Sequence, residues 1–465
     1  MTQLQFLSWR NYPPERRLVL ALLVCVGAVM FTPASKVLVV LFPCGCLYVG
    51  FKSFKKSSAV FAEFVTWLFF LTPFVRRVVD YEAGTRDMAI ISTPFLVLFI
   101  PLLVVLARWR QIANRETAPF FYAIAAILYG AFIACIHSEF SSAATGLMMW
   151  ITPLAFGLYL LSERESIAAL YQGMEKAMLG GTLVAGAYGL IQYFFIPPWD
   201  AAWMRSVDMV TIGKPEPMEV RVFSTLNSPQ VLAAFLMVGI LLAYRLRSAW
   251  KYPILLAGVA SLALSSARSA WIGLLAGLAL HVFRASPKEK LHSIVATLGC
   301  ALLVIGALSI PDLSDALSNR FSTFTDLKHD ESALDRQETY ETVIEMLQRS
   351  PAGIGLGVDK GMADAENDSS VVAVLLSLGL PGSLVFAAAL AMCTFALFSA
   401  EAVRELPQLL GLQCCFTGLV VESPLNNVIN GQIAFLLWSL IGLSFGILLK
   451  RKTEILSEQT AAVVM

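Results

Sequence analysis

Long apolar runs dominate this sequence and restrict what it can fold into. Fourteen segments, most of them 15 to 20 residues long, carry few or no charged side chains. A helix needs about 20 mostly apolar residues to cross the hydrocarbon core of a bilayer. The 465 residues are 57% hydrophobic and 14% charged, whereas soluble domains are about 25% charged. The sequence therefore predicts an all-α, polytopic membrane helix bundle with about 12–14 transmembrane helices.

One of these runs is too long for a single straight crossing. Its segment Leu378-Gly379-Leu380-Pro381-Gly382 predicts a kink, because proline removes a backbone hydrogen bond and glycine weakens a helix. The first run is not read as a cleavable signal peptide, since no small-residue cleavage site follows it. The predicted spans are 18–32, 35–51, 58–75, 88–107, 119–137, 143–161, 178–197, 228–244, 253–266, 269–285, 291–310, 370–400, 405–421 and 431–449.

The charges between the spans predict the orientation in the membrane. Of the 34 Lys and Arg residues, 21 fall in the connections on one side, together with both ends of the chain. The other 13 are spread over the opposite side, which has two much longer loops. Because cytoplasmic connections carry an excess of Lys and Arg, we expect both termini in the cytoplasm.

The two long external loops cover about 198–227 and 311–369. In the second loop, the apolar residues Tyr340, Val343, Ile344 and Leu347 recur at helical spacing, which predicts an amphipathic helix over 333–349. The chain therefore divides into N-terminal transmembrane helices (1–197), transmembrane helices with external arginine motifs (198–310), a large external loop (311–369) and C-terminal transmembrane helices with a cytoplasmic tail (370–465).

Arginines on the outer side form the first candidate site. Arg268 lies between two apolar runs, Arg221 directly precedes a span, and Arg336 opens the amphipathic helix. An arginine at the centre of a membrane helix costs about 2.5–3.5 kcal/mol, so it usually has a function or a partner. Each guanidinium can hold two phosphate oxygens, and several together could bind a diphosphate without a metal ion.

Pairing with a nearby carboxylate is the alternative for these arginines. Asp80, Asp208 and Glu219 are the acids within reach in the sequence. This alternative applies most to three arginines expected on the short loop after the third span: Arg76, Arg77 and Arg86.

Acidic residues just before the kinked span form the second candidate site. They are Asp359, Asp364, Glu366 and Asp368. A carboxylate in such a cluster can act as a general base towards an alcohol. A solvated acidic loop is the alternative.

Other chemistry finds little support in the residues. The four histidines form no pair with metal-ligand spacing, and all eight cysteines lie within apolar runs, so neither a metal site nor a cofactor is predicted. The net charge of +1 gives no basic domain, which argues against nucleic-acid binding.

Four segments, in this order, resemble the O-antigen ligase and O-antigen polymerase family. Arg221-Val-Phe-Ser-Thr-Leu-Asn227-Ser-Pro229 resembles the pattern that opens one membrane helix, and Ser266-Ala-Arg268-Ser-Ala-Trp271 resembles the start of another. The external-loop pattern is matched by Asp335-Arg336, Tyr340 and Pro351-Ala-Gly353-Ile-Gly355-Leu-Gly357. Glu366-Asn367, followed by Leu375-Leu376, Gly379 and Gly382, resembles the helix that comes next. The resemblance covers about 215–450.

This resemblance implies a membrane glycosyltransferase of the GT-C type. Such enzymes polymerise or ligate glycans carried on undecaprenyl diphosphate, at the outer face of the bacterial cytoplasmic (inner) membrane, in surface polysaccharide assembly. The glycan passes to an acceptor hydroxyl with inversion and without a metal ion. The resemblance implies that Glu366 and Arg268 are catalytic, and that Arg221, Arg336, Asn227 and Asn367 bind substrate. Flippase and chain-length regulator proteins are the further partners that it suggests.

One departure from the family pattern keeps other functions open. The family ligase has a histidine where this chain has Glu366. A glutamate can still act as a base, and the difference favours a polymerase or exopolysaccharide branch over a lipopolysaccharide-core ligase. The alternatives are a transporter of small anions, which an arginine cluster would also attract, and a non-catalytic partner of a polysaccharide assembly complex.

Overall fold

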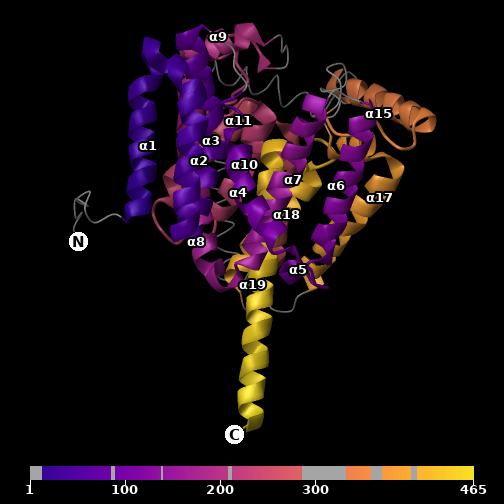
Figure 1. The fold of residues 1–465 in the computed structure, drawn as a ribbon. Coiled ribbons are helices and arrows are strands. Elements are labelled where there is room, and N and C mark those ends of the chain that lie inside the picture. The colour runs from indigo at the N-terminus through magenta and orange to yellow at the C-terminus, as the bar shows by residue number, and fades with distance from the viewer. Residues whose placement is uncertain are drawn as a thin grey trace.

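The computed structural model describes residues 13–84, 89–137, 140–207, 212–284, 331–357, 369–399 and 406–464. Within these ranges the chain forms sixteen α-helices and two short 3-10 helices, and it forms no β-strand (Figure 1). The expected all-α bundle is therefore confirmed. The 3-10 helices are η2 (Pro33–Val37) and η3 (Arg164–Ser166). The α-helices are α1 (Pro14–Met30), α2 (Leu38–Lys56), α3 (Ser58–Ala83), α4 (Thr93–Ala107), α5 (Trp109–Ile112), α6 (Ala118–His137), α7 (Phe140–Ser162), α8 (Ile167–Phe195), α9 (Pro198–Ser206), α10 (Pro229–Ala243), α11 (Lys251–Ser265), α12 (Arg268–Arg284), α15 (Glu331–Arg349), α17 (Ser370–Ser399), α18 (Pro407–Glu422) and α19 (Gly431–Val464).

Thirteen of the fourteen predicted spans coincide with helices of the structure. Among the described residues, seven helices are long and apolar enough to cross a membrane: α2 with η2, α3, α6, α7, α8, α17 and α19. Four shorter apolar helices, α4, α10, α11 and α18, match four more spans. The spans at 18–32 and 269–285 correspond to α1 and α12, with 17 residues each. The remaining span, 291–310, lies outside the described residues. The protein is an integral membrane protein.

The long helix α19 runs through the middle of the bundle and continues beyond it (Figure 1). It packs against α7 so closely that a Cβ atom added at Gly157 or at Gly442 would meet the backbone of the other helix. Small residues allow such close approach between membrane helices. Trp438 of α19 is fully buried and packs against Phe120 of α6 and Phe386 of α17.

Different helices lie at the two ends of the bundle. Helices α9 and α15 lie at one end, here called the α9–α15 end, whereas α5 and the end of α19 lie at the other (Figure 1). The helices α9 and α15 belong to the two long loops that the charge pattern assigns to a common side. The structure thus brings α9 and α15, the described helices of these two loops, to the same end of the bundle.

The kink expected in α17 is present at Gly379. This residue has φ 61° and ψ −174°, a conformation that is essentially restricted to glycine. The bend lets the segment 351–357 pack against α17, because Leu380 N donates to Pro351 O at 2.9 Å and Ile354 N donates to Leu376 O at 2.9 Å. Leu356 N donates to Gly130 O of α6 at 3.2 Å. These hydrogen bonds join the glycine-rich segment 351–357 to both α6 and α17.

The amphipathic helix expected over 333–349 is confirmed as α15. Val343 and Leu347 are buried against Val372 and Leu376 of α17. Ile344, which has the same helical spacing, is 54% exposed and takes no part in this contact. The helix lies against α17 along the stripe defined by Val343 and Leu347, which leaves the neighbouring residue outside the contact.

The expected position of Arg76 and Arg77 on a loop was wrong. The helix α3 continues to Ala83, so both arginines lie within it. The helix can extend past these charges because each is paired: Arg76 Nε lies 3.2 Å from Asp80 Oδ2 one turn later, and Arg77 pairs with a carboxylate of α9. Arg86 lies outside the described residues.

Candidate functional site

Arg221 lies over the turn that joins α11 to α12. Its Nε donates to Ser265 O at 3.3 Å, and its Nη2 donates to Ser266 O at 3.4 Å. Ser266 takes the left-handed conformation (φ 56°) that ends α11, and Arg268 is the first residue of α12. Both arginines are half-buried. Two candidate residues that are 47 positions apart in the sequence therefore meet at one turn.

Glu219, one of the carboxylates considered as a partner of Arg221, is engaged elsewhere. Lys214 Nζ lies 2.9 Å from Glu219 Oε2, and this hydrogen bond raises the pKa of Lys214. Both side chains are largely exposed. The neighbouring acid is thus committed to a surface lysine, while the guanidinium of Arg221 points to the α11–α12 turn.

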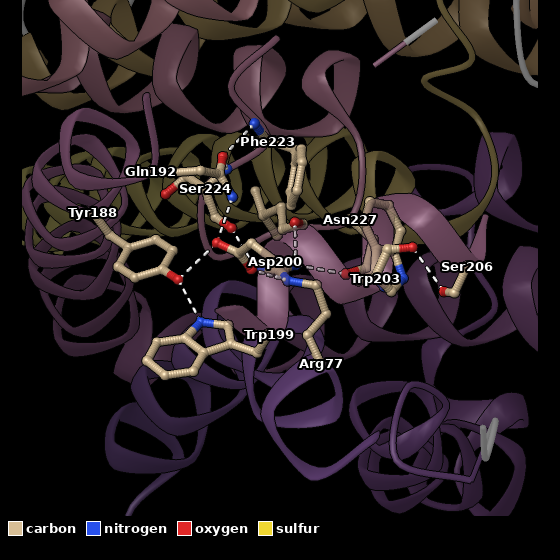
Figure 2. Close-up of polar contacts among 11 residues, drawn as sticks. Arg77, Tyr188, Gln192, Trp199, Asp200, Trp203, Ser206, Phe223, Ser224 and Asn227 are labelled. Carbon is tan, nitrogen blue, oxygen red and sulfur yellow. Dashed lines mark hydrogen bonds and ion pairs between the residues drawn. The ribbon is translucent and has the colours of Figure 1, made fainter. Parts of the chain in front are cut away.

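A buried arginine of α3 fixes the segment that follows Arg221. The side chain of Arg77 is fully buried, and its Nε donates to Asp200 Oδ1 of α9 at 2.8 Å (Figure 2). Its Nη1 donates to Leu226 O at 2.5 Å and to Asn227 Oδ1 at 2.7 Å, and its Nη2 donates to Ser224 O. One guanidinium thus donates hydrogen bonds to three acceptors in the segment 224–227.

The carboxylate of Asp200 extends this network to α8. Gln192 Nε2 donates to Asp200 Oδ2 at 2.7 Å, and Tyr188 OH donates to the same oxygen at 2.8 Å. Gln192 Oε1 accepts from the backbone amides of Phe223 at 3.0 Å and Ser224 at 2.8 Å. Figure 2 shows these side chains converging on the segment from α3, α8 and α9. A buried ion pair with its remaining hydrogen-bonding groups satisfied holds the local backbone in one geometry.

This network changes the interpretation of Asn227. The side-chain carbonyl of Asn227 accepts from Arg77, so this candidate substrate-binding residue joins the buried network that supports Arg221. Sequence reasoning underrated Arg77, whose partner lies 123 positions away. The available signal was a charged residue inside an otherwise apolar run.

A second cluster at the turn after α18 joins three helices. Ser370 N donates to Ser423 O at 2.9 Å, and Ser370 Oγ donates to Asn426 O at 2.9 Å. Val428 N donates in turn to Ser370 Oγ at 2.9 Å. These bonds fasten the first residue of α17 to the turn 423–428.

Helix α15 is attached to the same turn by a tyrosine. Tyr340 OH lies 3.1 Å from Ser369 Oγ and donates to Pro424 O at 3.4 Å. Arg336 belongs to α15 one turn before Tyr340, and the position of its side chain lies outside what the structure describes.

The candidate base also falls outside the described residues. Glu366 and Asn367 belong to the segment 358–368. Ser369, three residues after Glu366, is buried and bonded to Tyr340. The chain therefore leaves this segment at the junction of α15, α17 and the turn 423–428.

Glu422 is a further buried charge that sequence reasoning missed. It is the last residue of α18 and its side chain is fully buried. Its Oε1 accepts from Asn426 Nδ2 at 2.6 Å and from Ser269 Oγ at 3.4 Å. Ser269 follows Arg268 directly. The signal was again a single charged residue at the end of an apolar run.

Little in the described ranges suggests a bound metal ion or a second site. No group of three or more His, Cys, Asp or Glu side chains in those ranges could hold a metal. A groove of about 880 Å³ lies at the end opposite α15, between α6, α17 and α19. Its lining is mainly apolar, and its charged lining residues are Arg115, Glu116, Arg451 and Lys452. It contains none of the candidate residues.

Comparison with known proteins finds a family match, and it covers the part of the chain that contains several of these helix ends. Residues 253–387 match the family described as O-antigen ligase. The matched residues begin in α11 and end in α17, so they include Arg268, Arg336, Glu366 and Asn367, and they leave Arg221 and Asn227 outside. No curated protein and no solved structure matches the chain.

Proposed function

We propose, from the match of residues 253–387 to the O-antigen ligase family, that this chain belongs to that family and is a membrane glycosyltransferase of glycan assembly. It takes a glycan from an undecaprenyl-diphosphate carrier and transfers it to an acceptor hydroxyl, at the outer face of the bacterial cytoplasmic membrane. The α9–α15 end of the bundle is the external end and holds the catalytic centre.

The arginines act on the leaving group in this proposal. The acceptor oxygen attacks the anomeric carbon with inversion, and the bond between that carbon and the diphosphate oxygen breaks. The electron pair stays on the departing undecaprenyl diphosphate. Arg221, Arg268 and Arg336 neutralise the negative charge that grows there, which is the type of electrostatic stabilisation that lowers a barrier most. Guanidinium groups suit this task because each binds two phosphate oxygens.

Glu366 takes the proton of the acceptor hydroxyl. It needs to come within about 2.6–3.2 Å of that hydroxyl, or to reach it through one water molecule. Asn367 binds the substrate beside it, and Asn227 contributes by holding the segment that leads from Arg221 into α10.

One observation carries this proposal: the guanidinium of Arg221 contacts the turn from which Arg268 begins α12. Two half-buried guanidinium groups near one turn at the end of the bundle can together offer several N–H donors to the oxygens of one diphosphate. Their location at the ends of α11 and α12 also suits a substrate whose diphosphate lies at the membrane surface while its lipid chain remains in the bilayer.

Deletion of the gene followed by gel analysis of surface glycans tests this function. Loss of long chains is the result expected for a polymerase, whereas full-length chains retained on the lipid carrier are expected for a ligase. An unchanged glycan profile would contradict both, and would leave transport of a small anion as the function to test, by uptake of labelled anions into vesicles.

A further inference from the structure

Helix α18 is joined to α12 and α17 by two buried polar residues, one in its middle and one at its C-terminal end. In the middle, Gln413 Oε1 accepts from Arg284 Nη1 in the last turn of α12 at 2.9 Å, and Gln413 Nε2 donates to Leu397 O near the end of α17 at 2.7 Å. At the C-terminal end, Glu422 contacts the first turn of α12 through Ser269. Both side chains are fully buried.

Glu422 reaches α17 through its second hydrogen bond. Asn426 Nδ2 donates to Glu422 Oε1, and Asn426 O accepts from Ser370 Oγ, the side chain of the first residue of α17. The carboxylate therefore links the start of α12, where Arg268 lies, to the turn that binds the start of α17.

We propose that Glu422 is a positioning residue, which holds Arg268 in place by fixing the separation between the first turn of α12 and the first turn of α17. This role rests on the proposed glycosyl transfer. It requires no contact between Glu422 and the substrate, which agrees with its complete burial.

The hydrogen bonds predict how Glu422 performs this role. Both printed bonds end on Oε1, and Oε2 accepts no hydrogen bond from the described residues. A glutamine would keep the accepting oxygen in place, and an alanine would leave Asn426 Nδ2 buried without this acceptor. The account therefore requires the accepting oxygen of Glu422 and does not require its charge.

The experiment compares Glu422→Ala, Glu422→Gln and Gln413→Ala in purified protein reconstituted in lipid bilayers. Gln413→Ala is the matched control, because it removes a buried connection of α18 to the same two helices, at the ends of α12 and α17 that lie far from Arg268. Turnover is followed as transfer from an undecaprenyl-diphosphate-linked glycan, with kcat and KM measured separately. Thermal unfolding of each variant is measured alongside.

Glu422→Ala should lower kcat by about 10²-fold with a smaller change in KM, because a displacement of about 1 Å in a reacting group has such an effect. Glu422→Gln should stay within about threefold of the wild type, as expected when a hydrogen-bond acceptor is retained. Gln413→Ala should retain the wild-type kcat even if its unfolding temperature falls. Equal losses of kcat in Glu422→Ala and Gln413→Ala, or an inactive Glu422→Gln, would overturn the proposal.

A distance measurement separates this inference from the proposed function. Genetically encoded spin labels at Ile272 of α12 and Val371 of α17, both exposed, report the spacing of the two helix starts. The distance distribution should shift or broaden in Glu422→Ala, and should match the wild type in Glu422→Gln and Gln413→Ala. An unchanged distribution in Glu422→Ala contradicts the positioning role. Absence of transfer by the wild type, with the distances as expected, contradicts only the glycosyl transfer.

Discussion

At the scale of single residues, Arg221 and Arg268 both lie at the α11–α12 turn, but different parts of the structure hold them there. Arg268 lies there because it is the first residue of α12. Arg221 contacts the turn from the segment before α10, and the buried pair of Arg77 and Asp200 binds residues 224–227 of that segment. In the proposed function, a guanidinium held in this way is already oriented when the diphosphate of the donor arrives. Preorganised charge of this kind costs no rearrangement during the reaction.

Arg268→Ala should abolish chain extension while the protein remains in the membrane. Arg268→Lys should restore little activity, because an ammonium group is a point charge and cannot reproduce the two parallel hydrogen bonds of a guanidinium. The measurement is the length distribution of surface glycans in cells carrying each variant, with the amount of protein in the membrane fraction as the control. Normal chain lengths in Arg268→Ala would remove this residue from the mechanism.

Glu366→Gln should lower the transfer rate by about 10²–10⁴-fold, the usual contribution of a general base. The variant keeps the size of the side chain and loses its ability to accept a proton. Asp364→Asn, two residues earlier, is the matched control and should have a milder effect. Wild-type chain length in Glu366→Gln would favour a non-catalytic role for the protein.

Arg77→Ala should destabilise the fold by about 3–5 kcal/mol, because it leaves the carboxylate of Asp200 buried without its partner. The measurement is thermal unfolding in detergent. Arg16→Ala is the control: Arg16 also pairs with a carboxylate, Glu63 at 3.0 Å, but its side chain is 40% exposed, and exposed pairs contribute only about 0–1 kcal/mol. Equal unfolding temperatures for the two variants would contradict the structural role of Arg77.

At the scale of elements, the sequence predicts helices better than it predicts their ends. The kink of α17 and the helix α15 follow from local signals, namely glycine and proline in one case and apolar spacing in the other. The end of α3 could not be predicted in the same way. Its boundary was placed at Arg76, but the helix continues because the charge of Arg77 is satisfied by α9, an element that lies far along the chain.

Gly379→Ala should destabilise the protein by at least about 1–3 kcal/mol, because the backbone conformation at the kink is unfavourable for any residue with a Cβ atom. The new atom would also meet the carbonyl group of Ala352. Gly27→Ala in α1 is the control, since its Cβ atom would meet nothing within 4 Å. Thermal unfolding distinguishes the two, and a Gly379→Ala variant as stable as Gly27→Ala would contradict this account of the kink.

At the scale of the whole molecule, the residues that form the candidate site come from distant parts of the chain. The sequence predicted a membrane bundle and identified Arg221 and Arg268, which the structure brings to one turn. It could not identify the residues that position them. Arg77 with Asp200, and Glu422 with Ser269, are joined across 123 and 153 positions, and local sequence patterns contain no information about such pairs.

The most direct test of the glycosyl transfer is the release of undecaprenyl diphosphate by the purified protein. The protein is reconstituted in lipid bilayers with an undecaprenyl-diphosphate-linked glycan as donor and a glycan bearing a free hydroxyl as acceptor. The account predicts that the wild type releases undecaprenyl diphosphate in step with growth of the acceptor, also with a metal chelator present, and that Arg268→Ala releases none. Release at the same rate by Arg268→Ala, or no release by the wild type, would contradict it.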